Sequence, residues 1–414
     1  MPLNWIDVIY LLFATLVTFF GFLFVLLYVK NRGMLAKVPF MEKFPTVSII
    51  VPAYNEADNI AKVLRNLKNL EYPKGYSYKL GKGSKGSYEI IVVDDGSTDE
   101  TAAIAEAVGV QTVRKKRGGK ASALNEGLAK AKGEIIVCVD SDSYPDRTSL
   151  VQGVPFFAEK DVAAVTSRIF VNNAKGFLGR LQSIEYAMIA WTRKLFEYID
   201  SIYVTPGPLS FYRADVLKEV GGFDEKNLTE DIEIAWRLLD RGYKIKMSPG
   251  TVLTEVPSSF KAWWKQRIRW NVGGMQTLNK YKGSVFRADA FGSFILPFFT
   301  LSYGLALLAL SLFVYLIYLW AFNNILFIIS AQAAGLSPLK HLAPFFLPDM
   351  FTIFGVIIFA FSIFLVGAGL KEMQMKSTAG NWIGVFIYLT IYITLFPFIL
   401  VHSIIRYLRG KRGW

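Results

Sequence analysis

Long runs without a charged side chain limit this chain to a membrane-spanning architecture. Residues 8–29 and 290–339 contain no Asp, Glu, Lys or Arg, and neither do residues 350–370 and 381–405. An apolar helix of about 20 residues crosses the hydrocarbon core of a bilayer. A hydrophobic fraction of 53% and a mean hydropathy of +0.34 agree with this interpretation, and the apolar excess lies at both ends of the chain. The sequence therefore predicts membrane helices on either side of an inserted domain.

Charges beside the first apolar run indicate its orientation. Only Asp7 precedes the run, whereas Lys30, Arg32, Lys37 and Lys43 follow it. Cytoplasmic flanks of membrane helices are rich in lysine and arginine. We therefore expect a multi-pass protein of the plasma membrane, with its N-terminus outside and the inserted domain in the cytoplasm.

The apolar runs also divide the chain. We expect an N-terminal span within 1–30, an inserted domain at 31–285 and a C-terminal membrane region at 286–414. The C-terminal membrane region has room for about three spans. Asn323-Asn324 interrupts the first apolar run of this region. Three spans would leave the basic C-terminus outside, against the charge rule, so an extra span or re-entrant segment near 325–346 is the alternative. The number of spans and the side of the C-terminus stay open.

The inserted domain contains a buried strand that ends in two carboxylates. Residues 135–139 form a continuous apolar run, typical of a strand covered on both faces, and Asp140 and Asp142 follow directly. Ligands bind at the carboxyl ends of parallel strands. Two close carboxylates repel one another unless a cation lies between them, and oxygen ligands suit Mg²⁺ or Mn²⁺. An acidic turn without a metal is the alternative interpretation.

Polar residues follow two other strand-like runs in the same way. Ala53, Tyr54 and Glu56 follow the first run, and Asp95 follows the second. Parallel strands end at one edge of a sheet, so we expect these side chains to lie near one another. Gly118-Gly119-Lys120 then opens a helix, where backbone N–H groups and an ammonium can hold a phosphate. A solvated basic face is the alternative for this last segment.

The net positive charge of the chain limits the classes of binding partner that we expect. A formal net charge of +13 suits nucleic acid, an anionic lipid surface or a phosphate-bearing substrate. The sequence contains no recognisable nucleic-acid module. We therefore expect a phosphate-bearing substrate and membrane lipids as partners, and no nucleic acid.

Later stretches of the inserted domain allow both structural and chemical interpretations. Thr229-Glu230-Asp231 opens a helical run, which a threonine cap and the helix dipole explain without any chemistry. Residues 263–270 hold three tryptophans and two arginines, a density that suits either a membrane interface or a phosphate-and-sugar site. The helical run 175–203 carries an apolar stripe that we assign to the core in preference to a membrane surface. Residues 243–247 and 252–255 each indicate a short strand.

Taken together, these residues resemble a membrane-embedded family 2 glycosyltransferase. Such a resemblance implies a GT-A catalytic domain, an α/β fold built on a mostly parallel sheet, inserted between transmembrane helices. It covers residues 45–274 and rests on five motifs in order: Pro52-Ala53-Tyr54-Asn55-Glu56, Val93-Asp94-Asp95-Gly96-Ser97-Thr98-Asp99, Asp140-Ser141-Asp142, Thr229-Glu230-Asp231 and Gln266-Arg267-Ile268-Arg269-Trp270. The last two are similar to motifs of the processive β-glycosyltransferases that make hyaluronan, chitin, poly-N-acetylglucosamine or cellulose.

The resemblance implies a donor site. Tyr54 would stack on the uracil of a UDP-sugar, and Asp95 would accept the uracil N3–H. Asp140 and Asp142 match the metal-binding DxD motif, with Asp142 the more direct ligand of Mg²⁺ or Mn²⁺. The other nucleotide-sugar-binding residues that the resemblance implies are Ala53, Glu56 and Lys120.

The resemblance also implies a catalytic and acceptor side. Asp231 matches the base that takes the proton from the acceptor hydroxyl, with Glu230 beside it. The Gln266, Arg269 and Trp270 motif, QxxRW, would close over the diphosphate and floor the acceptor site. The implied lining of the acceptor pocket is the turn with Gly207, Leu209 and Ser210.

The implied activity is inverting, metal-dependent transfer from a UDP-sugar to the growing end of a β-linked polysaccharide that passes into the membrane. UDP-N-acetylglucosamine and UDP-glucose are the expected donors. Transfer of a single sugar to a lipid, as in ceramide glucosyltransferases, is the alternative, and a transporter or receptor with a degenerate transferase domain is a third hypothesis. The sequence does not specify the sugar, the product length, the acceptor or the oligomeric state.

Overall fold

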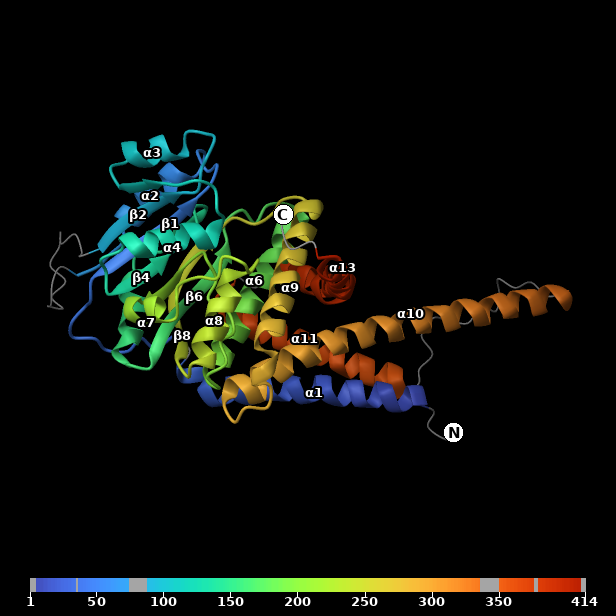
Figure 1. The fold of residues 1–414 in the computed structure, drawn as a ribbon. Coiled ribbons are helices and arrows are strands. Elements are labelled where there is room, and N and C mark those ends of the chain that lie inside the picture. Colours follow the sequence, from blue (N-terminus) through green and yellow to red (C-terminus); the bar gives the residue numbers. More distant parts are fainter. Residues whose placement is uncertain (1–4, 35, 74–87, 336–349, 376–378, 411–414) are drawn as a thin grey trace.

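The computed structural model describes residues 5–34, 36–73, 88–335, 350–375 and 379–410. An α/β domain forms one part of the molecule, and long helices from both ends of the chain form the other (Figure 1). The expected insertion of an α/β domain between apolar helices is therefore confirmed.

A single eight-stranded sheet, in the order β3-β2-β1-β4-β7-β6-β8-β5, forms the centre of the α/β domain. Strands β3, β2, β1 and β4 run parallel, and β7 is antiparallel to both of its neighbours. The two short strands expected between residues 243 and 255 are parts of one strand, Lys244–Thr254, whose residues 244–247 and 251–254 pair with β6 on either side of an irregularity. The strands are β1 (Val47–Ala53), β2 (Tyr88–Asp94), β3 (Gln111–Arg114), β4 (Ile135–Cys138), β5 (Ser143–Pro145), β6 (Val162–Val171), β7 (Ser210–Arg213) and β8 (Lys244–Thr254).

Helices cover both faces of this sheet. Alternate strand residues point to opposite cores: Ile50 and Ile136 pack in one core, whereas Ile49 and Val137 pack in the other. This double burial explains the continuous apolar runs of the central strands. Helix α2 covers the second face, and α4, α6 and α8 cover the first. The helices of the domain are α2 (Ile60–Lys68), α3 (Thr101–Ala107), α4 (Lys120–Lys130), α5 (Ser149–Gly153), α6 (Gly176–Glu197), α7 (Ala214–Glu219), α8 (Glu230–Asp240) and α9 (Phe260–Tyr281).

Four helical segments among the described residues are long and apolar enough to cross a membrane: Val8–Asn31, Phe291–Ala333, Phe354–Glu372 and Trp382–Leu408. They comprise α1 (Trp5–Asn31), α10 (Leu296–Ala333), α11 (Met350–Glu372), and α12 (Ala379–Ile387) with α13 (Phe396–Leu408). The expected interruption at Asn323-Asn324 is wrong, because α10 continues through it and the Asn324 side chain donates to the Trp320 carbonyl at 2.7 Å. Residues 336–346 of the expected extra segment lie outside the described residues, so that segment stays a prediction.

The apolar helices contact the α/β domain directly. Helix α6 packs on the sheet with one side and on α11 with another, where Gly369 lies against the Trp191 ring. Helix α9 packs along α13. Helix α6 is therefore a core helix, as expected, that also joins the domain to the apolar helices. Most of α10 extends away from the domain (Figure 1).

Candidate active site

A cavity of about 250 Å³ opens at the carboxyl ends of β1, β2 and β4. Parallel strands that end at the same edge bring together side chains from distant parts of the sequence. Every residue expected to bind the nucleotide-sugar or the metal lines this cavity. The lining is Pro52, Ala53, Tyr54, Glu56, Asp95, Lys120, Ala123, Asp140, Ser141 and Asp142.

The Asp95 carboxylate is held by the loop that precedes α4. Its oxygens accept hydrogen bonds from the backbone N–H groups of Gly118 at 2.8 Å and Gly119 at 2.7 Å, and from Lys115 Nζ at 2.8 Å. The positive φ of Gly119, 92°, allows the turn that aims these groups at Asp95. This contact joins the end of β2 to the start of α4. A role for Asp95 in binding a base stays a prediction.

Arg117 lies over the ring of Tyr54, with its guanidinium carbon 3.6 Å from the ring centroid. No pattern in the sequence indicated this contact, because Arg117 belongs to a run of basic residues that is equally typical of a solvated face. The expected stacking surface for a base on Tyr54 is therefore covered on one side by a cation. Lys115 and Arg117, which contact Asp95 and Tyr54 of the cavity lining, had no role of their own in the prediction from sequence.

Lys120 connects the donor cavity to the start of α8. Its Nζ lies 2.5 Å from Asp140 Oδ1 and 3.3 Å from Glu230 Oε1. Burial lowers the pKa of Lys120, but the carboxylates of Asp140, Glu230 and Asp231 more than offset it, so the net pKa is raised. Lys120 is therefore a permanent cation between two acidic motifs.

The acidic side of the cavity fits a divalent cation. Asp142 Oδ1 is hydrogen-bonded by Ser143 Oγ at 3.0 Å and by Thr254 Oγ1 at 3.4 Å. Burial and the nearby charge of Asp140 raise the pKa of Asp142 to about 6, so ionised Asp142 is destabilised until a cation neutralises the pair. No group of three or more His, Cys, Asp or Glu side chains is arranged for a metal among the described residues. Two carboxylates suit an ion that takes its other ligands from a diphosphate and water.

The start of α8 carries the expected base. Burial, followed by the charge of Glu230, raises the pKa of Asp231 to about 6, and Lys120 and Arg269 act in the opposite direction. The Asp231 backbone carbonyl accepts hydrogen bonds from Thr205 N at 3.2 Å and Thr205 Oγ1 at 3.1 Å. An aspartate whose pKa lies near 6 is a suitable proton acceptor at neutral pH.

Thr229 stands at the N-cap position of α8, but its side chain accepts no helix N–H. Its hydroxyl donates to Asn227 Oδ1 at 3.2 Å instead. The expected N-cap position of Thr229 is therefore confirmed, although its side chain makes no capping hydrogen bond. The reason is a close contact with α9, since a Cβ atom at Gly273 would lie 2.2 Å from Thr229 Oγ1.

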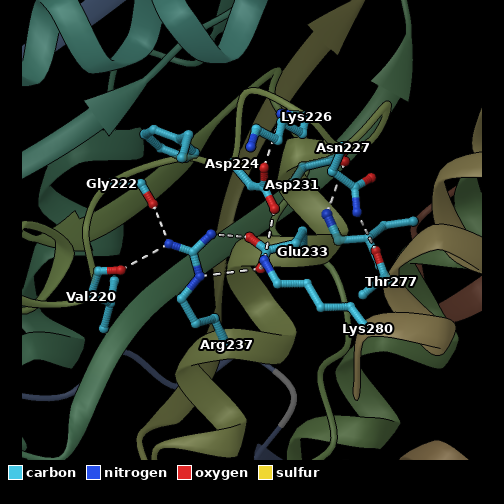
Figure 2. A network of polar contacts seen from close by, with 12 residues as sticks. Val220, Gly222, Asp224, Lys226, Asn227, Asp231, Glu233, Arg237, Thr277 and Lys280 are labelled. Carbon is cyan, nitrogen blue, oxygen red and sulfur yellow. Dashed lines mark hydrogen bonds and ion pairs between the residues drawn. The ribbon is translucent and has the colours of Figure 1, made fainter. Parts of the chain in front are cut away.

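A buried network fixes α8 against α9 (Figure 2). Glu233, which is fully buried, accepts hydrogen bonds from Lys280 Nζ at 2.6 Å, Tyr281 Oη at 2.8 Å and Arg237 Nε at 3.2 Å. Arg237 Nη1 also donates to the carbonyls of Val220 at 2.9 Å and Gly222 at 2.8 Å. The network sets the position of the helix whose first turn carries Asp231. The sequence offered no signal for it, because Glu233 reads as an ordinary helical glutamate.

The QxxRW motif lies on α9 beside that first turn. Arg269 Nη1 donates to the Leu228 carbonyl at 3.0 Å, directly before Thr229-Glu230-Asp231. Gln266 accepts a hydrogen bond from Arg267 Nη1, and Trp270 is half-buried. The structure thus brings Arg269 close to Asp231. The expected parts of Gln266, Arg269 and Trp270 at the diphosphate and the acceptor stay predictions.

The turn before β7 contributes to the site mainly through Gly207. A Cβ atom there would lie 2.1 Å from Lys120 Nζ and 2.6 Å from both carboxylate oxygens of Asp140. Leu209 and Ser210 are fully buried, and Ser210 Oγ donates to the Pro206 carbonyl at 2.7 Å. Because both side chains are buried, they could affect an acceptor pocket only through the shape of the turn, and this expected role stays a prediction.

Comparisons with known families now give the class of protein. The family described as Glycosyl transferase family 2 matches residues 48–221, and Glycosyl transferase family group 2 matches residues 135–400, more than half of the chain. The chain therefore belongs to the family 2 glycosyltransferases, and it is an enzyme of that class.

Individual relatives agree with this assignment. The poly-beta-1,6-N-acetyl-D-glucosamine synthase of Staphylococcus epidermidis is 30% identical to this chain, and the match covers 65% of this chain. The same match covers 64% of the staphylococcal protein, which is less than two thirds of its length. The probable glycosyltransferase YdaM of Bacillus subtilis is 33% identical over 60% of this chain and 59% of its own. A mannosyltransferase from Pyrobaculum calidifontis, solved with GDP-Man and Mn²⁺, has a TM-score of 0.55 at 20% identity, covering 96% of this chain and 99% of its own. That likeness confirms the GT-A fold.

Proposed function

We propose that this glycosyltransferase adds sugars from a UDP-sugar to the growing end of a β-linked polysaccharide, with inversion at the anomeric carbon. The observation that carries this proposal is the position of Lys120, whose ammonium contacts both Asp140 of the donor cavity and Glu230 beside Asp231. A donor bound at the cavity would have its diphosphate and its anomeric carbon within reach of a single polar cluster.

UDP-N-acetylglucosamine is the proposed donor. The staphylococcal relative is named a poly-beta-1,6-N-acetyl-D-glucosamine synthase, and the family 2 match over residues 48–221 includes the whole cavity. Tyr54 would bind the uracil face and Asp95 would support the base-binding loop. UDP-glucose differs only at C2 of the sugar and is the first competitor to test.

Asp140 and Asp142 are the residues that would hold Mg²⁺ or Mn²⁺. When bound, the ion would supply positive charge that stabilises the diphosphate leaving group. Lys120 lies beside Asp140 and adds a fixed positive charge on the same side of the cavity. Both features favour departure of UDP.

The proposed transfer is a single displacement. Asp231 accepts the proton of the acceptor hydroxyl while that oxygen forms its bond to the anomeric carbon, and the bond from that carbon to the diphosphate oxygen breaks to release UDP. No enzyme nucleophile is needed, so one base suffices. Glu230 is held by Lys120, which leaves Asp231 as the base that α8 presents.

The acceptor side would consist of Gln266, Arg269 and Trp270 together with the turn at Gly207. Helix α9 carries the motif and packs on α13, so the acceptor site lies next to an apolar span. This proximity supports passage of a polar chain into the plasma membrane from a cytoplasmic catalytic domain. The same proximity favours the second candidate, transfer of one sugar to a membrane lipid.

Product size distinguishes the two candidates. Detergent-purified enzyme would be incubated with Mn²⁺ and radiolabelled UDP-N-acetylglucosamine or UDP-glucose, and the products would be separated by gel electrophoresis and lipid extraction. We expect a ladder or high-mass product that Asp231→Asn abolishes while UDP binding persists. A single adduct that partitions into the lipid phase would exclude the polysaccharide and establish the glycolipid.

A further inference from the structure

A buried polar cluster joins the QxxRW helix to the last apolar span. Arg267 of α9 faces Glu185 of α6, with Nε 3.1 Å from Oε1 and Nη2 bonded to Oε2. Tyr392, in the last apolar span, donates its hydroxyl to Glu185 Oε2 at 2.7 Å. The Trp263 indole N–H donates to the same Tyr392 oxygen at 2.6 Å. Three separate segments therefore meet at one carboxylate.

The cluster is almost closed to solvent. The exposed fraction is 1% for Arg267, 4% for Glu185 and 2% for Tyr392. Packing alone does not require charges here, because buried ion pairs are commonly no more stabilising than apolar side chains of similar volume. What a bidentate pair provides is a fixed orientation of the guanidinium. The neighbouring side chains of α9 contact the guanidinium in this fixed orientation.

Arg267 contacts two residues of the QxxRW motif, Trp270 and Gln266. Its guanidinium carbon lies 4.1 Å from the ring centroid of Trp270, and it also lies 5.6 Å from that of Trp263, which precedes the motif. Trp263, Arg267 and Trp270 are spaced i−4, i and i+3, so they share one face of α9. Arg267 Nη1 also donates to Gln266 Oε1. The conformation of both motif side chains therefore depends on a cation that Glu185 and Tyr392 hold in place.

We infer that Arg267 is a positioning residue for the acceptor motif, and that Tyr392 of the last apolar span completes its support through Glu185. This inference rests on the proposed function, in which Trp270 and Gln266 serve the acceptor. It assigns to the apolar span a part in arranging the catalytic site, in addition to crossing the membrane. None of the residues that line the donor cavity belongs to the cluster.

The test separates donor chemistry from acceptor transfer in the full-length enzyme. Tyr392→Phe removes one hydroxyl and leaves the Glu185–Arg267 pair intact. UDP release without acceptor measures donor hydrolysis, and incorporation of labelled sugar measures transfer. We expect hydrolysis within about twofold of the wild type and transfer reduced about tenfold, because loss of a hydrogen bond to a charged group changes an equilibrium by about that factor. Arg267→Lys, which loses the bidentate geometry, should reduce transfer further.

Tyr388→Phe is the matched control. Tyr388 lies one turn before Tyr392 in the same span, and its ring stacks on that of Tyr392. Among the described residues its hydroxyl makes no hydrogen bond, so its removal should leave hydrolysis and transfer unchanged. An equal fall of hydrolysis and transfer in Tyr392→Phe would indicate general damage and overturn the inference, as would unchanged transfer.

A second measurement does not depend on activity. Enzyme labelled with 5-fluorotryptophan would give a ¹⁹F signal for Trp270, identified by its loss in Trp270→Phe. We expect Tyr392→Phe and Arg267→Lys to shift that signal and Tyr388→Phe to leave it in place. An unchanged signal in both test variants would overturn the inference. If the wild type transfers no sugar to any acceptor, the proposed function fails, whereas this signal still decides whether the cluster holds Trp270.

Discussion

Gly207 lies so close to Lys120 that a Cβ atom at position 207 would fall 2.1 Å from the lysine Nζ. The same atom would lie 2.6 Å from both carboxylate oxygens of Asp140. The turn before β7 therefore presses backbone, with no side chain, against the ion pair that joins the donor cavity to α8. A Cβ atom at this position would therefore displace the Lys120 ammonium or the Asp140 carboxylate from the pair.

Gly207→Ala is expected to reduce turnover about 100-fold, because a displacement of about 1 Å at reacting groups can cost that much. The measurement is UDP release at saturating donor, with UDP affinity determined separately by calorimetry. Gly283→Ala is the control, since a Cβ atom there meets nothing within 4 Å. Normal turnover in Gly207→Ala would mean that the contact between Lys120 and Asp140 is dispensable.

Much of this site could be predicted from sequence because strands buried on both faces have a simple pattern. The apolar run at 135–139 and the polar residues after β1 and β2 were sufficient to bring Tyr54, Asp95 and Asp142 to one edge. The Gly118-Gly119 opening of a helix predicted Lys120, and the resemblance supplied Asp231. These elements depend on local spacing and on the geometry of a parallel sheet, both of which are regular.

The parts that escaped prediction depend on contacts between distant segments. Arg117 stacks on Tyr54 across a loop, and Glu233 is buried by partners from α9 that no periodicity connects to it. Thr229 occupies the predicted N-cap position, but Gly273 brings α9 against its side chain, which makes no capping hydrogen bond. At Asn324 the side chain satisfies the preceding turn of its own helix, so two polar residues did not end α10. In each case tertiary packing outweighs local preference.

Activity is expected to depend on pH through Asp231. Burial and the charge of Glu230 raise the pKa of Asp231 to about 6, and a base acts only when it is ionised. The value of kcat/KM should therefore fall about tenfold per pH unit below that pKa and reach a plateau above it. The measurement is the initial rate of UDP release between about pH 5 and pH 8. The donor concentration is kept well below KM, so that the rate is proportional to kcat/KM.

Asp231→Asn is expected to reduce turnover about 1000-fold and to remove this pH dependence. A carboxylate whose pKa is raised by folding opposes folding where it is ionised, at neutral pH, so the variant should melt no lower than the wild type. That result would separate loss of the base from loss of the fold. Asp215→Asn, an exposed change of the same kind on α7, should leave both properties unaltered. Retained activity in Asp231→Asn would assign the base elsewhere.

Removal of divalent metal is expected to abolish turnover. Asp142→Asn should lower the apparent affinity for Mn²⁺ by about tenfold or more. Among the described residues no group of three or more His, Cys, Asp or Glu side chains is arranged for a metal, so each carboxylate of the pair Asp140 and Asp142 should contribute strongly. UDP release titrated with Mn²⁺ after chelation gives the apparent affinity. Asp161→Asn changes a surface carboxylate that pairs with Lys244 and serves as the control. Full activity in the presence of excess chelator would contradict the metal assignment.

Glu233→Gln tests whether the network in Figure 2 holds α8 in place. Glu233 is fully buried and pairs with Arg237 and Lys280, so its neutralisation leaves two cations partly uncompensated. Removing one member of a buried pair costs about 3–5 kcal/mol, and we expect a corresponding fall in Tm in detergent. Lys280→Met should cost about 1 kcal/mol or less, because the Lys280 side chain is 43% exposed and its pairs are screened by solvent. Equal changes in Tm for the two variants would show that Glu233 does not organise the network, and the position of Asp231 would then depend on Gly273 and Thr205 instead.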